Sequence, residues 1–159
     1  MRRRVSVSSF SSSLARLFHP HLDVKVIPRP HIVQQFLHAI GSHDTSRAEP
    51  LLHHSLQFWQ APSKFSAEEK TYFKHELLEA TRMRSQYIEK NKIEVLHVHE
   101  TLDAKIVVEC RNTSTFRHEV PQFGIKAGSD LVSHSVMIFT FDEGEEGGIV
   151  GVRCYDSFG

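Results

Sequence analysis

The chain has few cysteines, no surplus of charge of either sign and no long hydrophobic run. Its two cysteines, Cys110 and Cys154, are too few for a disulfide framework or a four-cysteine zinc site. Basic and acidic residues number 19 each, so no basic excess is available to bind a nucleic acid backbone. The longest apolar runs, such as residues 106–108 and 136–139, are far shorter than the roughly 20 residues of a membrane span. We therefore expect one ordinary domain of 159 residues with no nucleic acid partner and no membrane.

Residues 1–29 differ in composition from the rest of the chain. They are rich in serine and contain one acidic residue, Asp23, against six basic residues. Such a composition predicts a flexible basic segment that does not fold by itself. The same arginine-rich, serine-rich pattern is also typical of a mitochondrial presequence. We predict a cytoplasmic protein, with a mitochondrial location as the alternative.

Three helices are predicted in the first half of the remaining chain, residues 30–159. The first covers residues 30–41, where apolar residues recur at helical spacing and Gly41 gives a stop. A second helix is expected from Ser46, with Glu49 completing a capping box, to about residue 56. The third is expected from Ser66, with Glu69 as its capping partner, to about residue 90.

The pattern then becomes extended, with many β-branched residues and short polar turns. Four antiparallel strands are predicted over residues 93–100, 104–113, 131–141 and 149–156. Helices first and strands last indicate an α+β fold with the helices on one face of a curved sheet. The long segment 117–131 is expected to be a functional loop, and it contains His118 and Phe123.

This order of elements resembles the SnoaL-like polyketide cyclase family of the nuclear transport factor-like, cystatin-like superfamily. The likeness is carried by residues 33–56, by residues 93–111, and by Ile-Phe-Thr-Phe-Asp through Gly-Gly-Ile-Val-Gly-Val-Arg-Cys-Tyr-Asp at residues 138–156. It implies three helices packed on the concave face of a mainly antiparallel sheet, which together form a cone with an internal pocket. It also implies a homodimer and cofactor-independent acid–base chemistry on a small molecule.

The residues that the family uses for catalysis are absent at the matching positions. The aspartate of its last strand corresponds to Cys154, and the histidine of the preceding strand corresponds to Val136. The chemistry must therefore be argued from other residues of this sequence. The candidates for the wall of an apolar ligand pocket are Trp59, Phe36, Val136, Cys154, Phe123 and His118.

A histidine and an aspartate are the candidate catalytic pair. If Phe141 pairs with Ile149 across the last hairpin, regular antiparallel pairing places Val136 opposite Cys154. His134 then lies opposite Asp156, close enough for the carboxylate to orient the imidazole as a general base. A solvated, purely structural pair is the alternative.

Three functional hypotheses remain open. The first is a lyase, isomerase or cyclase that removes a proton beside a carbonyl of a polyketide-like or terpenoid-like substrate, without a cofactor. The second is a non-catalytic ligand-binding or dimerisation module of the same fold. The third is a metal-dependent enzyme using His97 and His99, which we consider less supported because no third ligand follows at a suitable spacing, so no metal is predicted.

Dimerisation is expected through the outer face of the sheet. Met137, Phe139 and Phe141 alternate along the third predicted strand. If these side chains point away from the helices, they leave an apolar patch that a second copy of the chain would cover.

Overall fold

The fold is α+β, as the sequence predicts. It was obtained as a computed structural model, which describes residues 27–144 and 147–158. The segment predicted as flexible, residues 1–29, lies outside the described residues except at its end. In chain order the helices and strands are α1 (Arg29–Gly41), α2 (Thr45–Ala48), the 3₁₀ helix η1 (Glu49–Leu51), β1 (Leu52–Gln60), β2 (Lys70–Phe73), α3 (Lys74–Arg84), β3 (Ile88–Glu100), β4 (Ile106–Phe116), the 3₁₀ helix η2 (Pro121–Phe123), β5 (Asp130–Phe141) and β6 (Ile149–Phe158).

The six strands form one mixed sheet in the order β2-β1-β6-β5-β4-β3. All neighbouring strands are antiparallel except β1 and β6, which run parallel. The last strand of the chain therefore lies in the middle of the sheet, between β1 and β5. The prediction of a mainly antiparallel sheet is confirmed.

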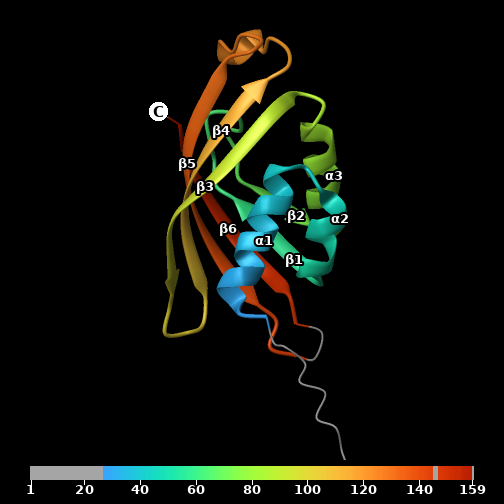
Figure 1. Cartoon of the computed structure of the whole chain (residues 1–159), viewed down its shortest axis with the longest axis vertical. Coiled ribbons are helices and arrows are strands. Elements are labelled where there is room, and N and C mark those ends of the chain that lie inside the picture. Colours follow the sequence, from blue (N-terminus) through green and yellow to red (C-terminus); the bar gives the residue numbers. More distant parts are fainter. Residues whose placement is uncertain (1–26, 145–146, 159) are drawn as a thin grey trace, which may run out of the picture.

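Helices α1, α2 and α3 lie on one face of the sheet, which we call the inner face; the opposite face is the outer face (Figure 1). Phe36 of α1 packs edge-on against Phe139 of β5, with ring centroids 5.9 Å apart. Both side chains are at most 1% exposed. Val33, Leu56 and Ile106 complete the centre of this core, and burying such side chains gives the fold most of its stability.

The prediction of a second helix, from Ser46 to about residue 56, is wrong over most of that range. Helix α2 ends at Ala48, and Asp44, rather than Ser46, caps it by accepting a hydrogen bond from the Arg47 amide. The chain then enters strand β1 at Leu52. Leu52 and Leu56 are four residues apart, a spacing that fits one face of a helix and also one face of a strand, so periodicity alone could not separate the two.

The third predicted helix is too long at both ends. Residues 70–73 form strand β2, which pairs with β1 through Phe58 and Tyr72, and α3 begins only at Lys74. The Glu76 carboxylate accepts a hydrogen bond from the Phe73 amide, so the capping role belongs to Glu76 and not to Glu69. At the other end, β3 begins at Ile88, opposite Phe116.

The four predicted strands are present, each with boundaries within about five residues of the prediction. Strand β3 begins at Ile88, inside the segment that was predicted to be helical, and β4 continues to Phe116. The loop after β4 contains η2, and the backbones of Val120 and Ile125 bridge its base. No helix among the described residues is long and apolar enough to cross a membrane.

Strands β5 and β6 pair as predicted at Phe141 and Ile149 but not beyond this point. Thr140 pairs with Gly151, so Val150 has no partner on β5 and the register shifts by one residue. This irregularity is a β-bulge, in which one strand carries an extra residue. All later pairs are offset, and Met137, rather than Val136, lies opposite Cys154.

The predicted outer apolar face is also wrong. Met137, Phe139 and Phe141 are all buried, because they point to the helices and belong to the core. Val132 and Val136 instead point to the outer face, where they are 41% and 39% exposed. Both alternating sets of side chains on β5 contain apolar residues, so the sequence pattern did not determine which set faces the helices.

We predict that Gly148→Ala destabilises the fold by about 3 kcal/mol, from backbone strain and overpacking together. Gly148 has φ +93°, and a Cβ there would lie 3.2 Å from both the His53 amide nitrogen and the Leu51 carbonyl oxygen. Gly147→Ala is the matched control: φ is +60° but a Cβ there meets nothing within 4 Å, so the loss should be about 1 kcal/mol. Urea unfolding measures both, and equal losses would contradict the close-approach argument.

Candidate functional site

The inner face of the sheet changes from apolar to polar along its length. Toward the β3–β4 turn it carries the core side chains Ile106, Val108 and Phe139, all fully buried. Toward the β4–β5 loop the same face carries side chains with amide, hydroxyl and carboxylate groups. We call this set the inner polar cluster: Gln60, Asn91, Asn112, Ser114, Ser133, Ser135 and Asp156.

Asp156 is the charged member of the inner polar cluster and has three hydrogen-bond partners. The Ser135 hydroxyl donates to Oδ1 over 2.5 Å, and the Gln60 amide donates to Oδ2 over 3.1 Å. The Cys154 thiol also points to Oδ1, with a sulfur–oxygen distance of 3.4 Å. These partners come from β1, β5 and β6, so the carboxylate is held in a defined orientation.

Asn112 extends this network to β4. Its Nδ2 donates to Ser135 Oγ over 2.9 Å, while its buried Oδ1 has no hydrogen-bond partner among the described residues. A buried polar atom without a partner costs free energy unless a water molecule or a ligand completes its bonding. The inner polar cluster is therefore not fully satisfied by the protein.

The two cysteines lie on the inner face beside Asp156. Burial raises the pKa of the Cys110 thiol to about 11, and the negative charge of Asp156 adds to this effect while a hydrogen bond with Ser135 opposes it. Burial also raises the pKa of Cys154 strongly, with Asp156 again adding to the effect. Both thiols are neutral near pH 7, so neither is an activated nucleophile.

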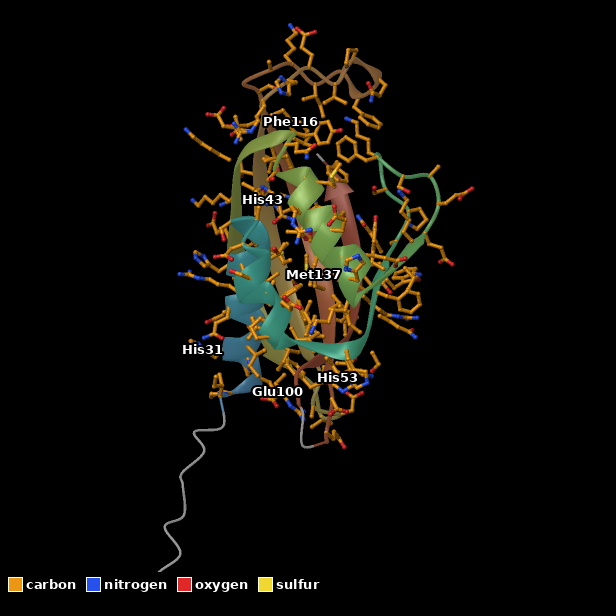
Figure 2. All side chains as sticks on the ribbon, turned by 90° about the vertical axis from the view of Figure 1, so that its right-hand side faces the viewer. His31, His43, His53, Glu100, Phe116 and Met137 are labelled. Carbon is orange, nitrogen blue, oxygen red and sulfur yellow. The ribbon has the colours of Figure 1, made fainter. Side chains whose placement is uncertain are left out.

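His43, between α1 and α2, brings a buried imidazole to the helical side. Both ring nitrogens are buried, although the residue as a whole is only half-buried. Burial lowers the pKa of His43 and the charges of Arg84 and Arg117 lower it further, while a hydrogen bond with the Thr81 backbone opposes these effects. Along the long axis His43 lies between Met137 and Phe116, the stretch that contains the inner polar cluster (Figure 2).

The predicted pair of His134 with Asp156 is wrong, because of the bulge. His134 pairs with Ser157, and Asp156 pairs with Ser135. Residues directly opposite each other share a face and successive residues alternate, so His134 points to the outer face and Asp156 to the inner face. His134 is exposed, and the orienting partner of the carboxylate is Ser135.

The residues predicted to line one pocket fall in three places. Phe36 and Cys154 lie on the inner side and are buried. Val136 and Trp59 lie on the outer face. There Trp59 packs against Tyr155 with ring centroids 5.3 Å apart, and its indole nitrogen donates to Glu69 over 3.1 Å.

Phe123 and His118 belong to the loop between β4 and β5. Phe123 packs edge-on against Phe65, with centroids 4.7 Å apart, and Phe65 in turn packs against Phe158 at 4.8 Å. This aromatic group joins the β1–β2 connection, the β4–β5 loop and the end of β6 near the inner polar cluster. His118 is exposed and does not take part in it.

A groove of about 780 Å³ lies on the outer face. Trp59, Ile138 and Arg153 line it, and the Arg153 guanidinium lies 5.4 Å from the Trp59 ring centroid. Lys105, Thr71 and Thr140 are also among the lining residues. The groove is thus separate from Asp156, which faces the opposite side of the sheet.

His97 and His99 share the outer side of β3, with stacked rings whose centroids are 6.2 Å apart. Within residues 27–144 and 147–158, no three histidine, cysteine, aspartate or glutamate side chains are grouped so that they could hold a metal ion. The metal hypothesis therefore gains no ligand set from the structure.

Sequence reasoning missed Ser135, Gln60, Asn112 and His43. A signal was present, because Ser133 and Ser135 occupy the same alternating set of strand positions as Met137 and Phe139, which are buried. Polar residues in the buried phase of a strand indicate an internal polar site. The sequence alone could not determine which alternating set of β5 side chains faces the helices, because this requires the register between β5 and β6.

Comparisons with known proteins identify the fold. No family model matches the sequence, and no curated protein matches it. A protein assigned as a SnoaL-like polyketide cyclase, from Shewanella denitrificans, superposes with a TM-score of 0.65 at 13% identity, covering 80% of this chain and 89% of its own. A protein with a ketosteroid isomerase-like fold from Catenulispora acidiphila, solved with trimethylamine, gives 0.61 at 12% identity, covering 79% and 85%.

A third structure, an epoxide hydrolase of M. tuberculosis similar to LEH, superposes with a TM-score of 0.59 at 13% identity and covers 80% of each chain. These likenesses show that the chain has the fold shared by SnoaL-like and ketosteroid isomerase-like proteins, as the sequence resemblance implied. At such low identity they show the fold and not the activity.

We predict that both cysteines resist alkylation by iodoacetamide in the native protein at pH 8. With a pKa of about 11, only about one Cys110 thiol in a thousand is ionised at pH 8, and the thiolate is the reactive form. Mass spectrometry over time should show labelling far slower than that of N-acetylcysteine, and unfolding in guanidinium should restore it. Rapid labelling of the folded protein at pH 8 would contradict the neutral, buried state.

Proposed function

We propose that this protein is a cofactor-independent enzyme of the lyase, isomerase or cyclase type. Its substrate would be an apolar, carbonyl-containing molecule of polyketide-like or terpenoid-like character, and its general base would be Asp156. The observation that carries this proposal is the position of the Asp156 carboxylate in the inner polar cluster, directly beside an apolar core wall. A small-molecule site typically combines such apolar walls with a few oriented polar groups.

In the proposed reaction Asp156 removes a proton from the carbon next to the carbonyl. Ser135 and Gln60 hold one carboxylate oxygen each, so the base is oriented before the substrate arrives. Burial of the surrounding side chains keeps water away from the enolate that forms. Asp156 then returns the proton to a different carbon, which gives an isomerised product. Where the enolate carbon instead attacks a second carbonyl of the same molecule, a carbon–carbon bond forms, Asp156 gives the proton to the resulting alkoxide, and the product is cyclised.

The solved structures of the same fold support a role in small-molecule chemistry. Their descriptions include a SnoaL-like polyketide cyclase and an epoxide hydrolase. These descriptions apply to those proteins. For this chain they support the class of substrate, while the choice of base rests on its own residues.

A non-catalytic ligand-binding module is the second candidate, and one observation favours it. Both oxygens of Asp156 already accept hydrogen bonds from the protein, from Ser135 and Cys154 at Oδ1 and from Gln60 at Oδ2. These hydrogen bonds occupy lone pairs that would have to receive the proton of a substrate. The two candidates differ in whether the bound ligand loses a proton.

Proton abstraction can be tested with 1-tetralone, a bicyclic ketone with exchangeable protons beside its carbonyl. In D₂O the native protein should speed deuterium incorporation at that carbon, measured by proton NMR. Asp156→Asn should lower the rate by about 10²–10⁴, because the amide cannot accept the proton. Binding of 1-tetralone without exchange would favour the ligand-binding module.

The matched control for Asp156→Asn is His134→Ala. His134 points to the outer face and does not contact the inner polar cluster, so its loss should leave the exchange rate unchanged. A loss of exchange in His134→Ala equal to that in Asp156→Asn would contradict the assignment of the base.

We also propose that a second copy of the chain covers the outer face to form a homodimer. The residues differ from those expected from the sequence: Val132, Val136 and Tyr155 are each about two-fifths exposed on this face. Together with Ile138 and Trp59 they give an apolar strip across β1, β5 and β6. Apolar patches of this kind mark interfaces between proteins.

We predict that Val136→Glu converts a dimer into a monomer. A charge at the centre of a self-complementary apolar interface is buried without a partner in both copies, which opposes association. Sedimentation velocity at micromolar concentration measures the change, and Leu102→Glu, at a fully exposed turn, is the control. A wild-type protein that sediments as a monomer would contradict the dimer.

The cytoplasmic location also stays a prediction, with the mitochondrial alternative, because residues 1–26 lie outside the described part of the chain. Imaging a fluorescent protein fused to the C-terminus distinguishes the two compartments.

A further inference from the structure

The groove on the outer face, which we call the outer groove, contains Gly151, where a side chain would fill part of the space. Gly151 pairs with Thr140 of β5 on one side and with Gln57 of β1 on the other, and all three line the groove. A Cβ at Gly151 would lie at ordinary contact distance, 3.5 Å, from the Thr140 side chain, and the backbone is not left-handed. The backbone therefore does not require a glycine here, and the hollow depends on the missing side chain.

One wall of the outer groove is aromatic and is held in a fixed orientation. Trp59 packs edge-on against Tyr155, with ring centroids 5.3 Å apart, and its indole N–H donates to Glu69 over 3.1 Å. Ile138 and Arg153, which pair with each other, continue this wall across β5 and β6. The Arg153 guanidinium lies 5.4 Å from the Trp59 ring centroid. A flat apolar surface and a positive charge thus lie side by side.

The positive charge of Arg153 is not neutralised by the protein. Arg153 is exposed, and no acidic side chain forms an ion pair with it in the described part of the chain. The other cation of the groove, Lys105, is already paired, because its Nζ lies 2.6 Å from Asp103 Oδ2. No aspartate or glutamate among the described residues lines the groove. The outer groove therefore offers one unpaired positive charge.

Side chains that can form hydrogen bonds also line the outer groove. They are Gln57, Thr71 and Thr140, and none of them has a side-chain hydrogen bond within residues 27–144 and 147–158. Amide and hydroxyl groups can each donate as well as accept. These groups can therefore bind polar atoms of a ligand without losing a bond within the protein.

We propose that the outer groove binds an aromatic carboxylate, with the carboxylate on Arg153 and the ring against Trp59 and Ile138. The planar guanidinium presents its N–H donors as a fork that matches the two oxygens of a carboxylate. One unpaired cation balances the single charge of a carboxylate, whereas a phosphate group at neutral pH carries more charge than one cation balances. A ligand with an ammonium group would be repelled by Arg153.

This site is separate from the proposed catalytic site. Asp156 faces the inner side of the sheet, while Arg153, three residues earlier on β6, faces the outer side. The inference therefore goes beyond the proposed function and does not depend on it.

The outer groove adjoins the apolar strip proposed for dimerisation. Trp59 and Ile138 belong to both, and Val136 lies on the side of Ile138 away from Thr140 and Gly151. A second copy of the chain is therefore the alternative occupant of the groove.

Calorimetry with 4-tert-butylbenzoate and 4-tert-butylbenzamide tests the proposal, because the two compounds differ in charge at nearly equal size. The native protein should bind the carboxylate about tenfold more tightly than the amide, the effect of a charge-assisted hydrogen bond. In Arg153→Gln this ratio should fall to about one. Arg111→Gln is the matched control, because Arg111 lies on the same face but pairs with Glu94 over 3.0 Å, and it should keep the wild-type ratio.

The position of the bound ring can be followed by fluorescence, because Trp59 is the one tryptophan of the chain. Binding should change the Trp59 emission with the same midpoint as in calorimetry. Gly151→Leu should abolish the binding of both compounds, since the leucine side chain fills the hollow, while its Tm stays close to that of the wild type. Where Gly151→Leu does not fold, Arg153→Gln decides alone.

Equal binding of the two compounds by the wild-type protein, or an unchanged ratio in Arg153→Gln, would overturn the proposal. Failure to bind 4-tert-butylbenzoate at millimolar concentration would overturn it as well. Weaker binding at higher protein concentration would show that a second copy of the chain fills the groove, which also contradicts a small-molecule site. Asp156→Asn should bind both compounds as the wild type does, so the result is independent of the catalytic proposal.

Discussion

The pairing of β5 with β6 shifts by one residue beyond Thr140, and this shift determines which side chains of β6 face the helices. Without the unpaired Val150, Tyr155 would take the inner position that Asp156 occupies, because a one-residue slip exchanges the two faces of a strand. The Asp156 carboxylate would then point to the outer face, away from Ser135. The arrangement of the inner polar cluster therefore depends on one extra residue in β6, Val150.

The sequence predicts the positions of the helices and strands better than it predicts which side chains of a strand face the core. Helix α1 and the four long strands could be recognised because each carries a sustained pattern of apolar residues. Helix α2 and strand β1 could not be separated, since Leu52 and Leu56 fit either period. Asp156 was found as a candidate by its position on the last strand. Its partner was misassigned, because a bulge leaves no mark in the pattern of a hairpin that is otherwise regular.

The two halves of the inner face serve opposite purposes. The half built from Phe139, Ile106 and Val108 buries apolar surface and stabilises the fold. The half that holds Asn112, Ser135 and Asp156 removes polar groups from water, and it leaves Asn112 Oδ1 without a hydrogen-bond partner among the described residues. The hydrogen bond that Asn112 Oδ1 lacks is one that a ligand bound in this half could supply.

The central place of β6 in the sheet has a consequence for biosynthesis. The hydrogen bond between Gln60 and Asp156 joins residues 96 positions apart, and β1 has β6 as one of its two neighbours in the sheet. A ribosome must therefore release nearly the whole chain before β1 can dock beside β6, and contacts of such high sequence separation slow folding. Until then the edges of β1 and β5 that β6 will occupy are open to other chains. Truncation near the C-terminus should thus affect solubility and yield in the cell before it affects any measured affinity.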